Sequence, residues 1–319
     1  MKIAFLGTPD FALPSLKMLH ERGDDVVVFT QPDKPVGRKA VMTPPPVKKA
    51  ALEYGMKVYQ FDKIKSEEGV AALKAEAPEL MVTAAFGQIL SRENLAVPKY
   101  GCINVHGSLL PKYRGAAPIQ WAVINGEKIT GVTTMLTDIG LDTGDILLKK
   151  ETEICENETA GELFDRLAEM GAELLKETIE ALERGELKPI KQNEAEATKC
   201  GMIKKEYGHI DFSRGKDAVH NLVRGMNPWP CAYAMLEGEA VKIWKTRHSD
   251  AEPSRGEPGL ILRADRFNGI LVDCGDGVIE ILELQFPGAK RMDAANAVLG
   301  HKMGFKVCLL YTSPSPRDS

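Results

Sequence analysis

Residues 2–30, KIAFLGTPDFALPSLKMLHERGDDVVVFT, place a helical pattern between two short apolar runs. The runs KIAFLG (2–7) and DVVVFT (25–30) are nearly continuous in apolar residues, which is typical of strands buried on both faces of a parallel sheet. The intervening FALPSLKMLHERG (11–23) favours a helix. This stretch therefore predicts a strand–helix–strand unit of an α/β fold.

The alternation of strand and helix patterns continues to about residue 150. KVYQF (57–61), ELMVTAAF (79–86) and GCINVHG (101–107) favour strands, and SEEGVAALKAEAP (66–78) favours a helix. Together they predict a Rossmann-like domain with a parallel, doubly wound sheet, in which ligands bind outside the carboxyl ends of the strands. The strand expected at 101–107 leads directly into the most unusual polar segment of the chain.

Length and composition limit the classes of protein to consider. The 319 residues are 44% hydrophobic, which is enough for a sizeable core and for about two domains. The net charge of −4 excludes a uniformly basic nucleic-acid coat but permits a local basic patch. Six widely spaced cysteines favour a reduced, cytoplasmic protein. No apolar run approaches about 20 residues, so we expect no membrane span, and the first apolar run is too short for a signal peptide.

The second half of the chain predicts a smaller domain. Thr159 and Glu162 form a capping-box pattern for a long helix that is expected to stop at Gly185. Several short strand-like runs with glycine turns follow, and they favour a small, OB-like β-barrel. We therefore expect a catalytic domain, a linker, a C-terminal domain and a tail, with the boundaries 1–186, 187–207, 208–307 and 308–319.

The tail, residues 308–319, continues no pattern and resembles translated sequencing-adaptor sequence. We expect it to be non-native, which would leave the C-terminal barrel without its natural end. The alternative is a natural disordered tail rich in Ser and Pro.

The segment 104–122, NVHGSLLPKYRGAAPIQWA, carries the first candidate chemistry. Asn104 and His106 are two residues apart, so they lie on the same face of an extended strand. An amide can donate a hydrogen bond to a developing oxyanion, and an imidazole can move a proton near neutral pH. Taken alone, however, Asn-x-His is more often a polar strand end whose hydrogen bonds are already satisfied.

A second segment adds a candidate carboxylate to the amide and the imidazole of the first. Residues 137–147, TDIGLDTGDIL, place Asp142 between two glycines in a loop that joins two strand-like runs. A carboxylate there can orient an imidazole or hold a water molecule, whereas the alternative is a solvated Asp/Gly turn. The dinucleotide-binding glycine motif, the P-loop and the H-E-x-x-H motif are all absent from the sequence.

Residues 30–49, TQPDKPVGRKAVMTPPPVKK, contain five prolines and five basic residues. The prolines disfavour a helix or a central strand. A basic loop beside a site can follow a nucleic-acid backbone, and the alternative is a solvated surface loop.

At this point the chain resembles the folate-dependent formyltransferases. The resemblance rests on NVHGSLLPKYRGAAPIQWA and DIGLDTGDI, and it covers about residues 1–305. The segments FLGTPDFA, QPDKPVGR, GHIDF and NPWP narrow it to members that formylate methionyl-tRNA.

The resemblance implies a role for particular residues. Asn104, His106 and Asp142 match the family's catalytic trio. The family's folate-binding segment matches Ser108, Leu109, Leu110 and Pro111, and Phe86 and Gly87 are expected to line the pterin pocket through backbone groups. The basic loop is expected to meet the tRNA acceptor stem through Arg38, Lys34 and Lys39, of which Arg38 matches the family's key arginine.

The implied reaction transfers the formyl group of 10-formyltetrahydrofolate to the α-amino group of initiator methionyl-tRNA, for translation initiation. The resemblance implies a cytoplasmic enzyme of bacterial type that acts as a monomer and needs no metal. One alternative keeps the chemistry but changes the acceptor to the amine of a sugar nucleotide or of glycinamide ribotide. Another is a non-catalytic RNA-binding protein, which the intact trio argues against.

Overall fold

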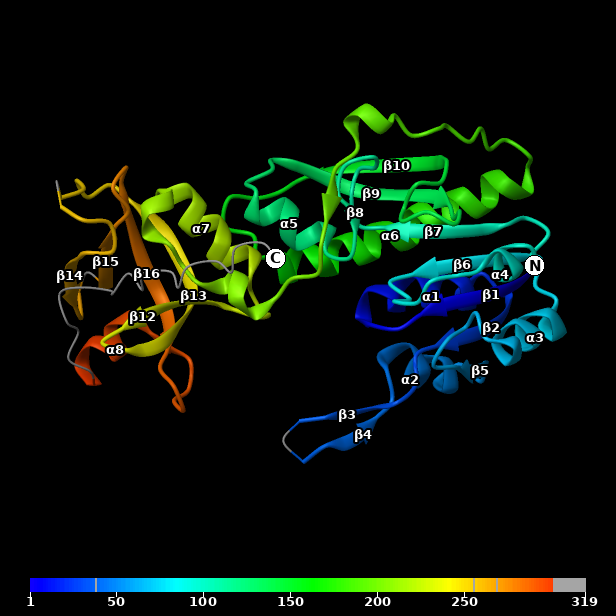
Figure 1. The fold of residues 1–319 in the computed structure, drawn as a ribbon, viewed down its shortest axis with the longest axis horizontal. Coiled ribbons are helices and arrows are strands. Elements are labelled where there is room, and N and C mark those ends of the chain that lie inside the picture. Colours follow the sequence, from blue (N-terminus) through cyan, green and yellow to red (C-terminus); the bar gives the residue numbers. More distant parts are fainter. Residues whose placement is uncertain (38, 255, 268, 301–319) are drawn as a thin grey trace, which may run out of the picture. The chain divides into compact units, whose positions relative to one another are not determined.

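The computed structural model describes residues 1–300 except Arg38, Arg255 and Asn268. These residues form two compact units, and each is described by itself (Figure 1). The first unit contains Met1–Pro118, Ile129–Glu153 and Leu163–Gly201. The second contains Ile119–Lys128, Ile154–Glu162 and the described residues from Met202 onward.

A seven-stranded sheet forms the centre of the first unit, in the order β10-β9-β7-β6-β1-β2-β5. Its strands are β1 (Lys2–Gly7), β2 (Asp25–Thr30), β5 (Lys57–Gln60), β6 (Leu80–Ala84), β7 (Cys102–His106), β9 (Ile129–Leu136) and β10 (Ile146–Glu153). The five strands from β7 to β5 are parallel, which confirms the predicted doubly wound sheet. The strand β9 pairs antiparallel with β7. The strand β10 pairs antiparallel with β9, because the loop 137–145 between them is too short for a helical crossover.

Helices connect and cover the parallel strands. Those of the first unit are α1 (Leu13–Glu21), α2 (Pro46–Glu53), α3 (Glu67–Glu76), α4 (Arg92–Leu95) and most of α6 (Ala160–Glu183), with a 3-10 turn η1 (Asp10–Ala12), whereas α5 (Pro118–Ile124) belongs almost wholly to the second unit. The predicted capping box begins α6, since Thr159 N donates to Glu162 Oε2 at 2.9 Å and Glu162 N donates to Thr159 Oγ1 at 3.2 Å. Gly185, in a left-handed conformation with φ +68°, follows its end.

The core of this unit forms because the strands are apolar on both faces. Side chains of β1, β2 and β6 pack with those of α3 and of the turn after β6. One continuous cluster of buried residues contains Ala4, Leu6, Val27, Phe29, Ile64, Leu73, Met81, Phe86, Leu90 and Cys102.

Two small sheets lie outside the central one. The proline-rich segment expected to be a loop forms a two-stranded antiparallel hairpin of β3 (Lys34–Val36) and β4 (Val41–Thr43). A hairpin accommodates Pro35, because a two-stranded ribbon leaves one edge of each strand unpaired. The other sheet pairs β8 (Arg114–Gly115) with β11 (Lys199–Cys200) in parallel.

The second unit contains the predicted smaller β domain. Its strands β12 (Ala232–Leu236), β13 (Glu239–Ser249), β14 (Ile261–Asp265), β15 (Gly269–Asp273), β16 (Val278–Gln285) and β17 (Met292–Asp293) pair antiparallel. The helices are α7 (Lys216–Gly225) and α8 (Ala294–Gly300), with 3-10 turns at η3 (Lys205–Gly208) and η4 (Phe212–Arg214), whereas the 3-10 turn η2 (Glu194–Glu196) belongs to the first unit. The expected non-native tail lies outside the described residues.

None of the helices in the described part of the chain is long and apolar enough to cross a membrane.

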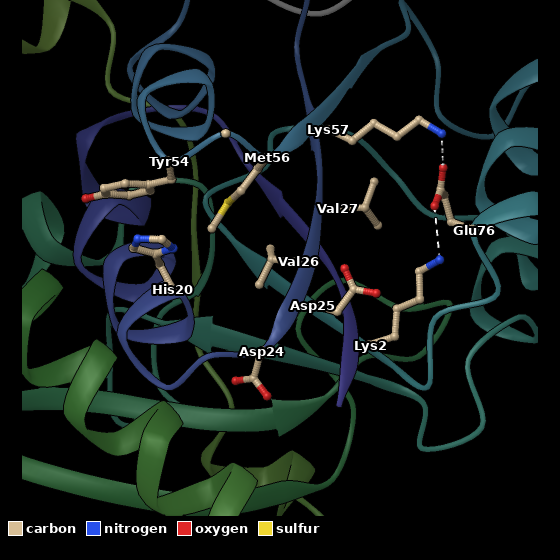
Figure 2. Close-up of a pocket in the computed structure, with 11 residues that line it drawn as sticks. Lys2, His20, Asp24, Asp25, Val26, Val27, Tyr54, Met56, Lys57 and Glu76 are labelled. Carbon is tan, nitrogen blue, oxygen red and sulfur yellow. Dashed lines mark hydrogen bonds and ion pairs between the residues drawn. The ribbon is translucent and has the colours of Figure 1, made fainter.

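A shallow pocket lies at the edge of the sheet where β1, β2 and β5 begin (Figure 2). Glu76, at the end of α3, is the centre of its charge network. Its carboxylate accepts hydrogen bonds from Lys57 Nζ at 2.5 Å and from Tyr59 Oη at 2.7 Å, and it pairs with Lys2 Nζ at 3.2 Å. The bonds from Lys57 and then Tyr59 favour the charged form and lower the pKa of Glu76 to about 2.

This network predicts an acid-sensitive contribution to stability. The pKa of Glu76 lies below the value of about 4.3 expected in the unfolded chain. Its contribution is therefore complete above that pH and is lost as the pH falls toward 2. We expect Glu76→Gln to lower the free energy of unfolding at pH 6 by on the order of 1 kcal/mol, with the deficit shrinking in acid. Chemical denaturation at several pH values measures it, and Glu53→Gln, at an exposed position, is the control.

Candidate active site

Two of the predicted site residues lie on β7, in the interior of the sheet. Asn104 pairs in register with Thr83 of β6 and with Met135 of β9. The Thr83 hydroxyl donates to Asn104 Oδ1 at 2.8 Å. Because this bond occupies the oxygen of the amide, Nδ2 is the end of Asn104 suited to donate toward a bound group.

His106, at the end of β7, is only 6% exposed, and the neighbouring backbone fixes its ring. Its Nε2 lies 2.9 Å from the carbonyl oxygen of Tyr113. A carbonyl can only accept, so Nε2 carries the proton. In the neutral ring Nδ1 is then an acceptor, and it faces Asp142 Oδ2 at 3.8 Å.

Asp142 lies in the loop 137–145, and the structure brings it to His106. Its backbone has a φ of +53°, a left-handed conformation that Asp tolerates better than most residues. Its Oδ2 accepts a hydrogen bond from the backbone N–H of Gly115 at 2.9 Å. Asp138 shapes the same loop, since its Oδ1 accepts from Gly140 N and from the Thr143 hydroxyl at 2.9 and 2.7 Å.

This loop is held by hydrogen bonds from residues that the sequence analysis did not single out. Gln192 Nε2 donates to the carbonyl oxygens of Asp142 and Gly144 at 2.8 and 2.7 Å. Its Oε1 accepts from Arg114 Nε at 3.0 Å. A lone Gln in a polar stretch gives no local signal, so its partners become visible only in the fold.

The expected folate segment, Ser108–Pro111, is tied down by its own hydrogen bonds. The Ser108 hydroxyl donates to Lys112 O at 2.7 Å, and the Thr133 hydroxyl donates to Ser108 O at 2.7 Å. Leu110 is fully buried and packs with Met135 and Ile146. Backbone groups and the partly exposed Leu109 are therefore the parts of this segment suited to meet a ligand.

The turn after β6 places Phe86 and Gly87 near the start of the chain. The Phe86 side chain is buried in the core, 5% exposed, so it acts as packing. Its carbonyl oxygen accepts from the Thr8 hydroxyl at 2.9 Å and from Gln31 Nε2 at 3.0 Å. Gly87 has a φ of +76° and is exposed, and a side chain there would collide with Gln31.

The basic hairpin begins beside this turn. Lys34 is exposed, and its Nζ donates to Gln31 Oε1 at 2.7 Å. Lys39 is exposed between β3 and β4. Arg38 lies outside the described residues. Val36, Val41 and Met42 expose more than half of their surface, so the hairpin combines basic and apolar groups.

The arrangement supplies three functions at one strand end: an amide donor, an imidazole that can accept a proton at Nδ1, and a carboxylate that can stabilise the resulting cation. Such a set can stabilise an oxyanion and move a proton. Within the described part of the chain, no group of three or more His, Cys, Asp or Glu side chains is placed to hold a metal ion. The pocket around Glu76 lies at the opposite edge of the sheet and takes no part in this chemistry.

Comparison with known proteins finds matches over both halves of the chain. Residues 1–179 match the family model for formyl transferase, and residues 202–302 match that for the formyl transferase C-terminal domain. A methionyl-tRNA formyltransferase of Acetivibrio thermocellus is 50% identical over 305 residues, which cover 95% of this chain and 98% of that protein.

Solved structures share the fold at low identity. WlaRD, a sugar 3N-formyl transferase solved with dTDP and 5-N-formyl-THF, superposes with a TM-score of 0.67 at 21% identity, over 91% of this chain and 99% of that one. HypX from Aquifex aeolicus, solved with tetrahydrofolic acid, gives a TM-score of 0.62 at 18% identity, over 98% of this chain and 52% of that one.

The candidate loop tolerates no side chain at position 144. A Cβ there would lie 1.7 Å from the carbonyl oxygen of Leu136, which belongs to the sheet and cannot move freely. We expect Gly144→Ala to lower the free energy of unfolding by about 1 kcal/mol or more. Gly201→Ala is the control, because a Cβ at that position meets nothing within 4 Å. Equal denaturation midpoints for the two variants would contradict this close approach.

Proposed function

Since the chain belongs to the methionyl-tRNA formyltransferases of the formyl transferase family, we propose that it transfers the formyl group of 10-formyltetrahydrofolate to the α-amino group of initiator methionyl-tRNA. The observation that carries the chemistry is the ordered pair of His106 and Asp142 beside the Asn104 amide at the end of β7. A sugar-nucleotide amine as acceptor is not favoured, because the sugar formyltransferase resembles this chain at only 21% identity.

The proposed reaction needs a neutral amine and a stabilised oxyanion. An α-amino group has a pKa of about 7.7–8.0, so a modest push from a base makes it nucleophilic. The amine attacks the formyl carbon, a C–N bond forms, and the carbonyl oxygen of the tetrahedral intermediate becomes an oxyanion. Asn104 Nδ2 donates to that oxygen. His106 Nδ1 accepts the proton that the attacking nitrogen loses, and Asp142 stabilises the imidazolium.

Collapse of the intermediate breaks the bond between the formyl carbon and N10 of the folate. The proton held by His106 passes to N10, so atoms and charge balance across the two steps. Direct transfer fits the cysteines near this strand, because burial raises the pKa of Cys102 to about 11 and also raises that of Cys200. Neither thiol is suited to carry the formyl group as a thioester.

The basic hairpin supports tRNA as the acceptor. Lys34 and Lys39 stand on an exposed ribbon where they can meet phosphate, and its exposed apolar side chains can pack against unstacked bases. Arg38 is assigned to the acceptor end of the tRNA by family resemblance. The proposal also takes the enzyme as a cytoplasmic monomer with a catalytic domain at 1–186, a linker at 187–207 and a tRNA-binding domain at 208–307.

Alanine at His106 or at Asn104 should abolish most of the turnover. We expect His106→Ala and Asn104→Ala each to lower kcat by about 10²–10³-fold, because each removes a group that acts on the transition state. The assay incubates the enzyme with 10-formyltetrahydrofolate and charged initiator tRNA and measures formylmethionine. Circular dichroism checks that the fold is intact. A variant with near wild-type kcat would exclude its residue from the chemistry.

The hairpin should govern use of tRNA. We expect Arg38→Ala to lower kcat/KM for initiator tRNA while leaving folate affinity unchanged. Lys39→Ala should give a smaller loss that shrinks at high salt, as for a simple phosphate contact. Lys34→Ala should give a similarly small loss, and because it also removes the bond to Gln31, its folate affinity tests whether that bond matters for the folate. Unchanged kcat/KM for Arg38→Ala would contradict a role of the hairpin in tRNA use and would favour the alternative of a solvated surface segment.

A further inference from the structure

We propose that Gln192 is a positioning residue that holds the Asp142 carboxylate within reach of His106. The inference rests on the proposed formyl transfer, and it adds a residue outside the catalytic trio and the folate segment. The hydrogen bonds of the Gln192 side chain run to Arg114 and to the backbone of the 137–145 loop, so it acts through that backbone.

A single amide spans the critical part of that loop. Both Nε2 hydrogens of Gln192 are used, one on Asp142 O at 2.8 Å and one on Gly144 O at 2.7 Å. The two carbonyls flank Thr143, so the amide fixes the direction of three consecutive residues. This matters because the left-handed backbone of Asp142 aims its side chain at Gly115 and His106.

Arg114 determines which way the Gln192 amide faces. Its Nε can only donate, so the oxygen of Gln192 must lie toward Arg114 and the NH2 group toward the loop. Arg114 is 3% exposed, and both of its terminal nitrogens donate to Glu194, at 2.9 and 2.7 Å. This bidentate pair holds the guanidinium in one plane and raises its pKa.

Gln192 belongs to a segment that also supports the other partner of His106. We call residues 190–200 the strap. At its start, Ile190 exchanges two backbone hydrogen bonds with Ile146. Near its end, the Thr198 hydroxyl accepts from Tyr113 N at 2.8 Å, and Thr198 O accepts from Arg114 N at 2.9 Å. Figure 1 shows this segment returning from the end of α6 past β10 to β8.

The strap therefore supports both groups that face the His106 ring: the Tyr113 carbonyl at Nε2 and the Asp142 loop at Nδ1. The loop needs this support, because Ile139 and Leu141 are exposed by more than 60% and give it little packing. The 3.8 Å separation of His106 and Asp142 leaves no direct hydrogen bond to resist a drift. A misplacement of about 1 Å in a catalytic constellation can cost about 10²-fold in rate.

Two substitutions separate the parts of the contact. Gln192→Glu keeps an acceptor for Arg114 but turns a carboxylate toward two carbonyl oxygens. Gln192→Met keeps the approximate size of the side chain and removes every polar contact. Glu196→Ala is the matched control, because its side chain bonds Asn193 within the strap. All three are compared with wild type by thermal unfolding, steady-state formylation of initiator methionyl-tRNA, and amide hydrogen exchange.

We expect both Gln192 variants to lose about 10- to 100-fold in kcat, with the KM for folate and for tRNA within about twofold of wild type. Amides in 137–145 should exchange faster in these variants, while those of the central strands do not change. The control should match wild type in every measurement. A purely structural role would instead lower the thermal midpoint and accelerate exchange throughout the unit.

The proposal is overturned if either variant keeps wild-type kcat, or if exchange in 137–145 is unchanged. Failure of the proposed function is recognised separately, because the wild-type enzyme would then form no formylmethionine. In that case the exchange measurement still decides whether Gln192 orders the Asp142 loop.

Discussion

The carbonyl oxygen of Tyr113 accepts a hydrogen bond from His106 Nε2–H, and this bond determines that Nδ1 is the nitrogen that faces Asp142. With Nε2 committed, only Nδ1 can gain or lose a proton during a reaction. The bond depends on an unusual backbone, since Tyr113 has a φ of +60°. It also depends on the next residues, because Gly115 presents its N–H to Asp142 and a Cβ there would lie 2.0 Å from Cys200 O.

The same arrangement of hydrogen bonds around a glutamine amide occurs twice in the first unit. Gln192 donates to two backbone carbonyls and accepts from Arg114; Gln31 donates to Phe86 O and Gly87 O and accepts from Lys34. In each case a basic side chain fixes the amide's orientation, and the amide fixes a turn at the carboxyl end of a strand. The two turns follow strands of opposite direction, since β9 is antiparallel to β7 and β6, and each needs such a clamp to hold a defined shape.

Much of the fold could be predicted because its signals are local. The apolar runs at 2–7 and 25–30 and the Thr159–Glu162 cap each depend on neighbouring residues. The antiparallel β9 and β10 and the hairpin at 34–43 were not predicted, because pairing direction depends on partners elsewhere in the chain. At the site, residue type and spacing made Asn104, His106 and Asp142 candidates, the family resemblance assigned them to a catalytic trio, and their roles stay predictions. Gln192 and Gln31 were not recognisable, since their bonds reach across 50 and 55 positions.

The strap also bears on how this enzyme can be divided or recombined. It follows α6, the last long helix of the first unit, so a truncation just after α6 would remove no helix or central strand of that unit. Such a fragment would keep Asn104, His106 and Asp142 but lose the bonds to Tyr113 and to the Asp142 loop. A chimera that keeps the candidate site therefore needs residues to about Gly201, which include the first part of the expected linker at 187–207.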